Sequence, residues 1–189
     1  MGEIAERYRR RAEVFERKVA AVQPDQWRNQ SPCAKWTALN VLEHVIEMHG
    51  VMLKPVARKL EPADDPLTAF QEARAAVEDV LDDPILALTE TDTPAGRMTA
   101  EQQIDQVISD DLVLHGWDLA RSTDQDETID PVDIERLWSK AIAISPELME
   151  KYRTPGALRA GVEVYGPEVA VPPDAPLQDR LLGLLGREP

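Results

Sequence analysis

The chain has 189 residues, of which 43% are hydrophobic and 30% are charged, a composition typical of one globular domain. Acidic residues outnumber basic ones by 35 to 21, and the net charge of −14 argues against binding to nucleic acids or anionic membranes. No stretch approaches the roughly 18 apolar residues that span a bilayer, and the first residues show no apolar signal core. The single cysteine, Cys33, is compatible with a reducing compartment. We therefore expect one cytoplasmic domain over residues 1–189.

The first part of the chain predicts two amphipathic helices. Apolar side chains recur at helical spacing over residues 3–22, which indicates the first helix. A proline-containing loop separates it from the second helix, for which Thr37 is the expected N-cap. The second helix is expected to run to about Leu60, with Pro55 as a kink or an early end.

Two further helices are expected before residue 123. One spans Leu67–Leu81, and the segment 82–98, which contains prolines and a glycine, is interpreted mostly as a connection. Thr99 and Gln102 have the spacing of a capping box, which would begin another helix that runs to about Ser122. Up to this point the pattern predicts a mainly helical bundle.

The rest of the chain predicts less regular structure. Pro131 begins a fifth helix, which Pro146 interrupts. Residues 162–171 alternate in hydrophobicity and indicate either a small hairpin or an extended arm. A short terminal helix follows over residues 175–185. Residues from about 154 to 189 are interpreted as a C-terminal extension packed on the bundle, because this stretch is too short for an independent domain.

The second helix directs one of its two histidines toward the core. At about 100° per residue, His44 lies on the edge of an apolar stripe, one turn after Val41 and one turn before Met48. His49 lies on the other edge, about 140° away by the same geometry, so the two histidines cannot easily share one metal ion. We expect His49 to flank the core, with contact to a substrate as the alternative.

The helix that follows Thr99 carries two polar residues on its apolar face. Asp111 and His115 lie there one turn apart, whereas Asp110 points elsewhere. A carboxylate in an apolar stripe needs a partner, and the i, i+4 spacing suits two ligands of one metal ion. With His44 as the third ligand, the set predicts a site for Zn²⁺, Ni²⁺ or Fe²⁺. The alternative is a buried Asp111–His115 ion pair, with His44 as a core histidine.

Several other residues allow two interpretations each. Cys33 is a candidate nucleophile, but a packed structural thiol is favoured because the sequence places no base or cation beside it. Trp36 and Trp117 are expected in the core or in a pocket wall. Asp118 has the spacing for a salt bridge with Arg121, and the alternative is that it orients a ligand histidine.

Three stretches of the sequence also carry a family pattern. They are Ser31-Pro32-Cys33-x-x-Trp36-Thr37 with Val41-Leu42-x-His44-Val45, then Asp110-Asp111-Leu112-x-x-His115-x-Trp117-Asp118-Leu119-Ala120, and the tail Val171-Pro172-Pro173-Asp174-Ala175-Pro176-x-Gln178-Asp179-Arg180-Leu181-Leu182 with Leu185-Gly186-Arg187. Together they resemble the DinB-like superfamily. More narrowly, they resemble the actinobacterial metal-binding proteins grouped with mycothiol-dependent maleylpyruvate isomerase.

The resemblance implies a DinB-like four-helix bundle with a divalent metal, usually zinc or nickel, at one end of its core. The family's two histidine ligands and one acidic ligand correspond here to His44, His115 and Asp111. The isomerase has Glu where this chain has Asp111, so the shorter side chain would make the site tighter or shift it. Dimers are common in the superfamily, which adds a homodimer as an expectation.

The function that the resemblance implies is thiol chemistry at a metal, with mycothiol or another small thiol acting on a small electrophilic substrate. The enzyme would be a thiol transferase or an isomerase. Alternatives are a metal-dependent hydrolase and a non-catalytic metal- or ligand-binding protein in stress response or regulation. The isomerase has a C-terminal α/β domain that contributes to its active site, whereas about 35 residues follow Thr154 here. This difference argues against maleylpyruvate isomerisation itself.

Overall fold

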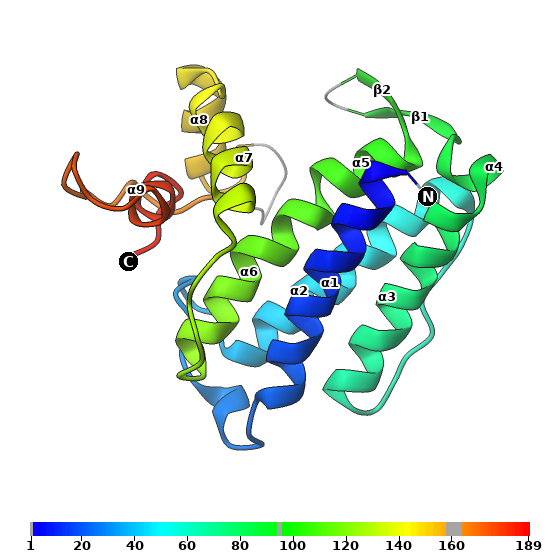
Figure 1. Cartoon of the computed structure of the whole chain (residues 1–189), viewed down its shortest axis with the longest axis horizontal. Helices are drawn as coiled ribbons and strands as arrows, with labels where there is room; N and C mark the ends of the chain where they lie inside the picture. Colours follow the sequence, from blue (N-terminus) through cyan, green and yellow to red (C-terminus); the bar gives the residue numbers. More distant parts are fainter. Residues whose placement is uncertain (1, 94–95, 158–163) are drawn as a thin grey trace. The chain divides into compact units, whose positions relative to one another are not determined.

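The computed structural model describes residues 2–93, 96–157 and 164–189 (Figure 1). The chain divides into two compact units. The bundle unit consists of Met1–Ser31 and Lys35–Glu127, and the C-terminal unit consists of Pro32–Ala34 and Thr128–Pro189. The expectation of a single domain over residues 1–189 stays a prediction. Among the described residues, no helix combines the length and the apolar character needed to cross a membrane.

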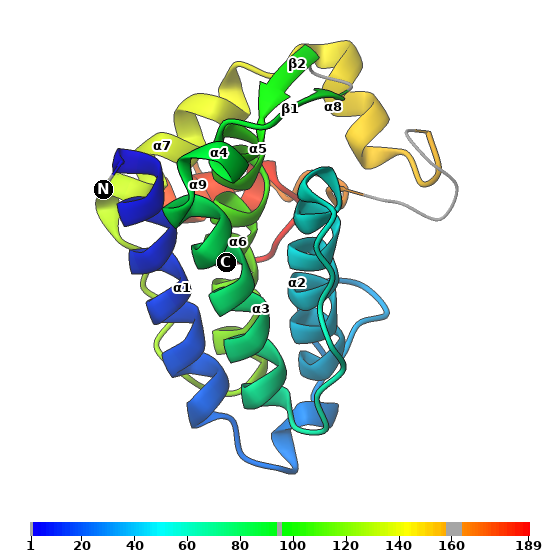
Figure 2. The same cartoon turned by 90° about the vertical axis from the view of Figure 1, so that its right-hand side faces the viewer.

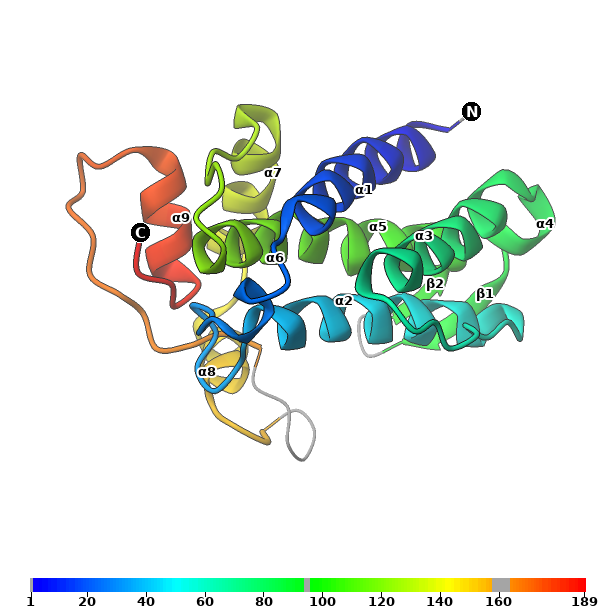
Figure 3. The same ribbon diagram turned by 90° about the horizontal axis from the view of Figure 1, so that it is seen from below.

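Four helical segments form the core of the bundle unit. They are α1 (Glu3–Ala21), α2 (Ala38–Leu53), α3 (Pro66–Asp82) and a fourth segment composed of α5 (Ala100–Gln106) and α6 (Ile108–Ser122). Both α1 and α2 pack against α3 on one side and α6 on the other (Figure 2, Figure 3). This arrangement confirms the all-α fold and the four-helix bundle expected from the sequence.

The apolar stripes of these helices meet in one core. Phe15 of α1 and Phe70 of α3 are fully buried, and their ring centroids lie 4.9 Å apart. Leu42 of α2 and Ile108 of α6 are buried in the same cluster. Fully burying one such side chain contributes about 1.5–3 kcal/mol, so the periodic apolar positions explain why these segments associate as helices.

Local sequence signals set the helix starts. Thr37 caps α2 in a capping box with Asn40, and Thr99 caps α5 in a capping box with Gln102, which confirms both expected N-caps. The second helix ends at Leu53, earlier than Leu60, and the chain continues as a 3₁₀ turn, η2 (Lys54–Val56), that contains Pro55. The early end follows from Pro55, which lacks the N–H that an α-helix needs.

Two features between residues 82 and 122 differ from the expectation. The helix after Thr99 is broken at Val107, whose ψ of −74° departs from α-helical geometry and separates α5 from α6. The segment interpreted as a connection contains the short helix α4 (Pro84–Ala87) and an antiparallel hairpin of β1 (Glu90–Thr93) and β2 (Gly96–Thr99). The hairpin strands are half exposed or exposed, so they lack the apolar alternation that would have marked them in the sequence.

The C-terminal unit contains three helices among its described residues. They are α7 (Pro131–Ile142), α8 (Pro146–Arg153) and α9 (Leu177–Leu184), and α7 packs on α9. The terminal helix expected over residues 175–185 is therefore confirmed. Of the hairpin or arm expected over residues 162–171, positions 162 and 163 lie outside the described residues. From Val164 onward the chain forms an arm without strands, on which the Val169 N–H donates to the Gly183 carbonyl at 3.0 Å.

Gly186 ends the terminal helix in a conformation that favours glycine. Its φ is 80°, and a Cβ at this position would lie 2.5 Å from the backbone of Gly166. The close approach requires a residue without a side chain, which explains why the arm can pack against the end of α9.

Candidate metal centre

The three expected ligands lie together in the bundle unit. His44 extends from α2, whereas Asp111 and His115 extend from consecutive turns of α6, which packs against α2. One donor atom from each of the three side chains lies within 4.8 Å of the other two. The packing of α2 on α6 therefore brings together the set that the sequence proposed as metal ligands.

The site is less buried than the sequence pattern indicates. Asp111 lies on the apolar side of α6, but its side chain is 26% exposed, and that of His44 is 28% exposed. His115 is deeper, with a side chain 10% exposed. The cluster is therefore partly exposed at His44 and Asp111 and more deeply buried at His115.

The spacing of His44 and Asp111 fits a bridging cation better than a direct bond. His44 Nε2 and Asp111 Oδ2 lie 3.8 Å apart, beyond the 2.7–3.2 Å of a hydrogen bond. Two donors on a tetrahedral zinc ion with bonds of 2.0–2.1 Å stand about 3.3 Å apart. A contraction of about half an ångström would bring these two atoms to that separation. The donor chemistry and the spacing thus both fit a divalent ion.

Electrostatics keep His44 in the form that a metal ligand needs. Burial and, to a smaller extent, the neighbouring His115 lower the pKa of His44 to about 4, against an opposing effect of Asp118. At neutral pH the imidazole is therefore uncharged, and an uncharged ring has a lone pair available for a metal ion.

The sequence allows two roles for Asp118, a salt bridge with Arg121 or the orientation of a histidine. Its carboxylate is fully buried, and Oδ2 accepts a hydrogen bond of 2.9 Å from Nδ1 of His115. Arg121, the other expected partner, instead pairs with Glu127 at 2.8 Å. The structure thus favours the interpretation in which Asp118 orients a ligand histidine. The i, i+3 spacing from His115 was the sequence signal that allowed this.

Trp36 forms an aromatic wall beside the two histidines. Its ring centroid lies 4.9 Å from that of His44 and 5.9 Å from that of His115, and it is stacked on His115 at an interplanar angle of 30°. The rings of His44 and His115 themselves meet edge to face at 4.9 Å. Trp36 also packs against the hydrophobic core, so it lies in both of the places expected for it, at the edge of the core and beside the candidate site.

Asp110, next to Asp111 in sequence, belongs to a different contact. It accepts a hydrogen bond of 3.0 Å from the guanidinium of Arg11, whose side chain is 1% exposed. This ion pair joins α1 to α6, and it agrees with the expectation that Asp110 points away from the face of Asp111.

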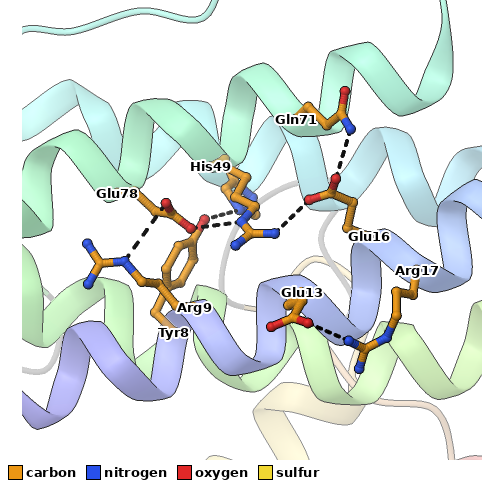
Figure 4. Close-up of polar contacts among 9 residues, drawn as sticks. Tyr8, Arg9, Glu13, Glu16, Arg17, His49, Gln71 and Glu78 are labelled. Atoms are coloured by element: carbon orange, nitrogen blue, oxygen red, sulfur yellow. Dashed lines mark hydrogen bonds and ion pairs between the residues drawn. The ribbon is translucent and has the colours of Figure 1, made fainter.

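His49 is a core residue. It is fully buried, its Nδ1–H donates to the Val45 carbonyl at 2.7 Å, and its Nε2 accepts from the Tyr8 hydroxyl at 3.0 Å (Figure 4). Burial lowers the pKa of His49 to about 4 and raises that of Tyr8, so both groups stay uncharged. The arrangement agrees with the favoured interpretation, in which His49 flanks the core.

Polar contacts join α1 to α3 at the surface near this buried pair. Gln71 donates to Glu16 at 2.8 Å, and Arg9 lies 3.8 Å from Glu78 (Figure 4). These residues are partly or fully exposed, and among the described residues they belong to no group that could hold a metal ion.

Cys33 lies in the C-terminal unit and is half buried. The sequence placed no cation beside it, and here the structure differs, because the guanidinium of Arg187 lies 3.9 Å from its sulfur. Arg187 follows Cys33 by 154 positions and is 6% exposed, so only the folded chain shows the contact. The contact removes the reason for which the packed thiol was favoured, and both interpretations of Cys33 stay predictions.

Comparisons with known proteins add a family relationship. A family model described as the mycothiol maleylpyruvate isomerase N-terminal domain matches residues 8–120, a range that contains His44, Asp111 and His115. Two uncharacterized proteins of Mycobacterium tuberculosis, from strains CDC 1551 / Oshkosh and ATCC 25618 / H37Rv, are each 27% identical over 184 residues. The alignment covers 95% of this chain and 95% of each relative. No solved structure matches.

Proposed function

Because the chain belongs to the mycothiol maleylpyruvate isomerase N-terminal domain family, we propose that it binds one divalent metal ion through His44, Asp111 and His115. The observation that carries the proposal is the convergence of three donor atoms within 4.8 Å from two different helices. Two imidazoles and one carboxylate favour zinc, with nickel and iron as alternatives.

The proposed ligand set leaves room for a small molecule at the ion. Three protein ligands on a four-coordinate ion keep one position for water or a substrate atom. That position would face solvent, because the side chains of His44 and Asp111 are partly exposed. Trp36 would form one wall of it and keep water from the faces of both histidine rings.

The family's name connects the site with a thiol, and we propose that the chain uses mycothiol or a related small thiol on a small electrophile. A bound divalent ion lowers the pKa of a coordinated thiol, so that the thiolate is present at neutral pH. The thiolate sulfur forms a bond to the electrophilic carbon while a bond at that carbon breaks. In an addition the π pair moves to the neighbouring atom and takes a proton from solvent, and in a substitution the leaving group departs with the pair; the thiol proton passes to solvent. The protein's residues hold the thiol at the open side of the cluster and shield it with Trp36. This reaction class comprises thiol transferases and isomerases.

The test is turnover with matched variants. Zinc-loaded or nickel-loaded protein is mixed with mycothiol and a fluorogenic electrophile, and conjugate formation is measured against the uncatalysed rate. His115→Ala should abolish the excess rate, whereas Glu72→Gln, at an exposed carboxylate of α3, should leave it unchanged. Excess conjugation that persists in metal-free His115→Ala would overturn the thiol chemistry. A stoichiometric metal without turnover would favour the non-catalytic alternative.

A further inference from the structure

We propose that Asp118 is a positioning residue that fixes His115 in the tautomer with the proton on Nδ1 and so directs Nε2 toward His44 and Asp111. The inference rests on the proposed function for the identity of the ion. Asp118 is not one of the three proposed ligands. The observation that supports its role is the hydrogen bond of 2.9 Å between Asp118 Oδ2 and His115 Nδ1.

The burial of Asp118 shows that this contact is built into the fold. Asp118 is fully buried, and His115 is 8% exposed. An ionised carboxylate loses several kcal/mol of solvation on burial unless it is paired and hydrogen-bonded. A fully buried Asp in the middle of α6 is therefore retained only if its contacts compensate, and the imidazole of His115 supplies one.

The hydrogen bond to Asp118 determines which nitrogen of His115 carries the proton. A carboxylate oxygen accepts and cannot donate, so His115 must carry its proton on Nδ1. The lone pair of the neutral ring then lies on Nε2, the atom available to a metal ion. Carboxylates that accept from the second nitrogen of a ligand histidine orient the ring and make it a stronger donor.

A second contact restrains the same ring. Trp36 stacks on the face of His115 at an angle of 30°, with centroids 5.9 Å apart. The hydrogen bond to Asp118 restrains rotation within the ring plane, and the stacked indole restrains tilting out of it. His44 Nε2 lies 3.8 Å from the Asp111 carboxylate, beyond the length of a hydrogen bond, so His115 is held more firmly than His44.

The protein's three histidines make the tautomer directly measurable. We would record long-range proton–nitrogen correlation spectra of the metal-free full chain at neutral pH and assign the rings with His44→Gln and His49→Gln. The Nδ1–H tautomer is expected for His115. His49, whose Nδ1–H donates to Val45, should show the same tautomer and so provides an internal standard.

Variants at Asp118 separate orientation from general stability. Asp118→Ala removes the acceptor, and Asp118→Asn keeps the shape but replaces the charge and allows the amide to donate. In both, the proton of His115 should shift partly or wholly to Nε2, while the His49 signals stay unchanged. Zinc affinity, measured by competition with a chromophoric chelator, should fall about 10–100-fold, as is typical for partners that orient a metal ligand.

Each outcome decides between the two proposals. A wild-type His115 with its proton on Nε2 overturns the positioning role, whatever happens to the variants. Unchanged zinc affinity in a folded Asp118→Ala overturns it as well, and leaves the metal site in place. The expected tautomer in a wild-type protein that binds no zinc supports the positioning role but contradicts the proposed function.

Discussion

Helix α2 carries two histidines five positions apart, and the bundle uses them in opposite ways. His44 is 28% exposed at the side chain and lies beside His115, Asp111 and the indole of Trp36. His49 is fully buried, and its two ring nitrogens form hydrogen bonds with uncharged partners, the Tyr8 hydroxyl and the Val45 carbonyl. The same residue type on the same helix thus meets a cluster of donors in one place and a closed apolar interior in the other.

The comparison teaches that the neighbours of a histidine, rather than its titration, distinguish a candidate ligand from a core residue. Burial is the largest cause of the lowered pKa at both positions, and both values are about 4. The two histidines differ in their exposure to solvent and in the side chains that surround them. His44 faces a carboxylate and a second imidazole at the solvent edge, whereas both nitrogens of His49 are already used within the fold.

The largest expected effect is on metal affinity. His44→Ala should weaken zinc binding by more than about 100-fold, since losing a ligand costs more than losing a partner behind one. Tyr8→Phe, which disturbs only the His49 pair, should leave zinc affinity within about twofold of wild type. Competition titrations on the two folded variants measure this difference, and equal losses in both would break the comparison.

The next effect concerns acid stability in the metal-free protein. The folded-state pKa of His49, about 4, lies below its unfolded value of 6.5, so the unfolded state binds more protons between these values. Stability is therefore fully present above pH 6.5 and falls as the pH drops toward 4, by on the order of 3 kcal/mol from this residue.

The control for this pH effect replaces both members of the buried pair. Tyr8→Phe/His49→Leu removes the titrating ring and its partner together, and urea unfolding is then measured at several pH values. The double variant should show a shallower loss of stability below pH 6.5 than wild type, while His44 and the carboxylates account for the remaining slope. Parallel profiles would show that His49 does not titrate as described.

A smaller effect is expected for the single variant Tyr8→Phe. Removing the hydroxyl leaves Nε2 of His49 buried without its donor, which costs about 1–3 kcal/mol. Chemical denaturation at pH 7.5 gives the free energy of unfolding directly. A variant as stable as wild type would mean that the Tyr8–His49 contact contributes nothing to the core.

The smallest effect is expected at the protein surface. Arg17 pairs with Glu13 one turn away on α1 at 2.6 Å, and both side chains are more than 60% exposed (Figure 4). Arg17→Gln should therefore change stability by less than about 0.5 kcal/mol. A loss above 1 kcal/mol at low salt that disappears at high salt would show that surface charge matters more here than burial.

Much of the candidate site could be predicted because helical periodicity fixes direction. The inward placement of His44 and the shared face of Asp111 and His115 follow from about 100° per residue. The packing of α2 against α6 does not follow from the pattern of either helix alone. The expectation that their side chains share one site depended on the family resemblance. The partner of Asp118 could not be predicted either, because His115 and Arg121 both lie three positions away from it in the sequence.

The rest of the fold shows where local pattern stops being informative. No proline or glycine near Val107 marks the break between α5 and α6, so the sequence predicts one continuous helix there. The hairpin of β1 and β2 lacks apolar alternation, and its pairing depends on contacts between residues such as Glu90 and Thr99. The contact between Cys33 and Arg187 joins residues 154 positions apart, which no local pattern reports.

The most direct test of the central claim is the metal content of the protein purified without chelators. Elemental analysis of wild type should find about one divalent ion per chain. Asp111→Asn should lower this content, whereas Glu72→Gln, which removes the same charge from an exposed position on α3, should not. Wild-type protein that holds no divalent metal even after incubation with zinc, or Asp111→Asn protein that holds as much as wild type, would contradict the account.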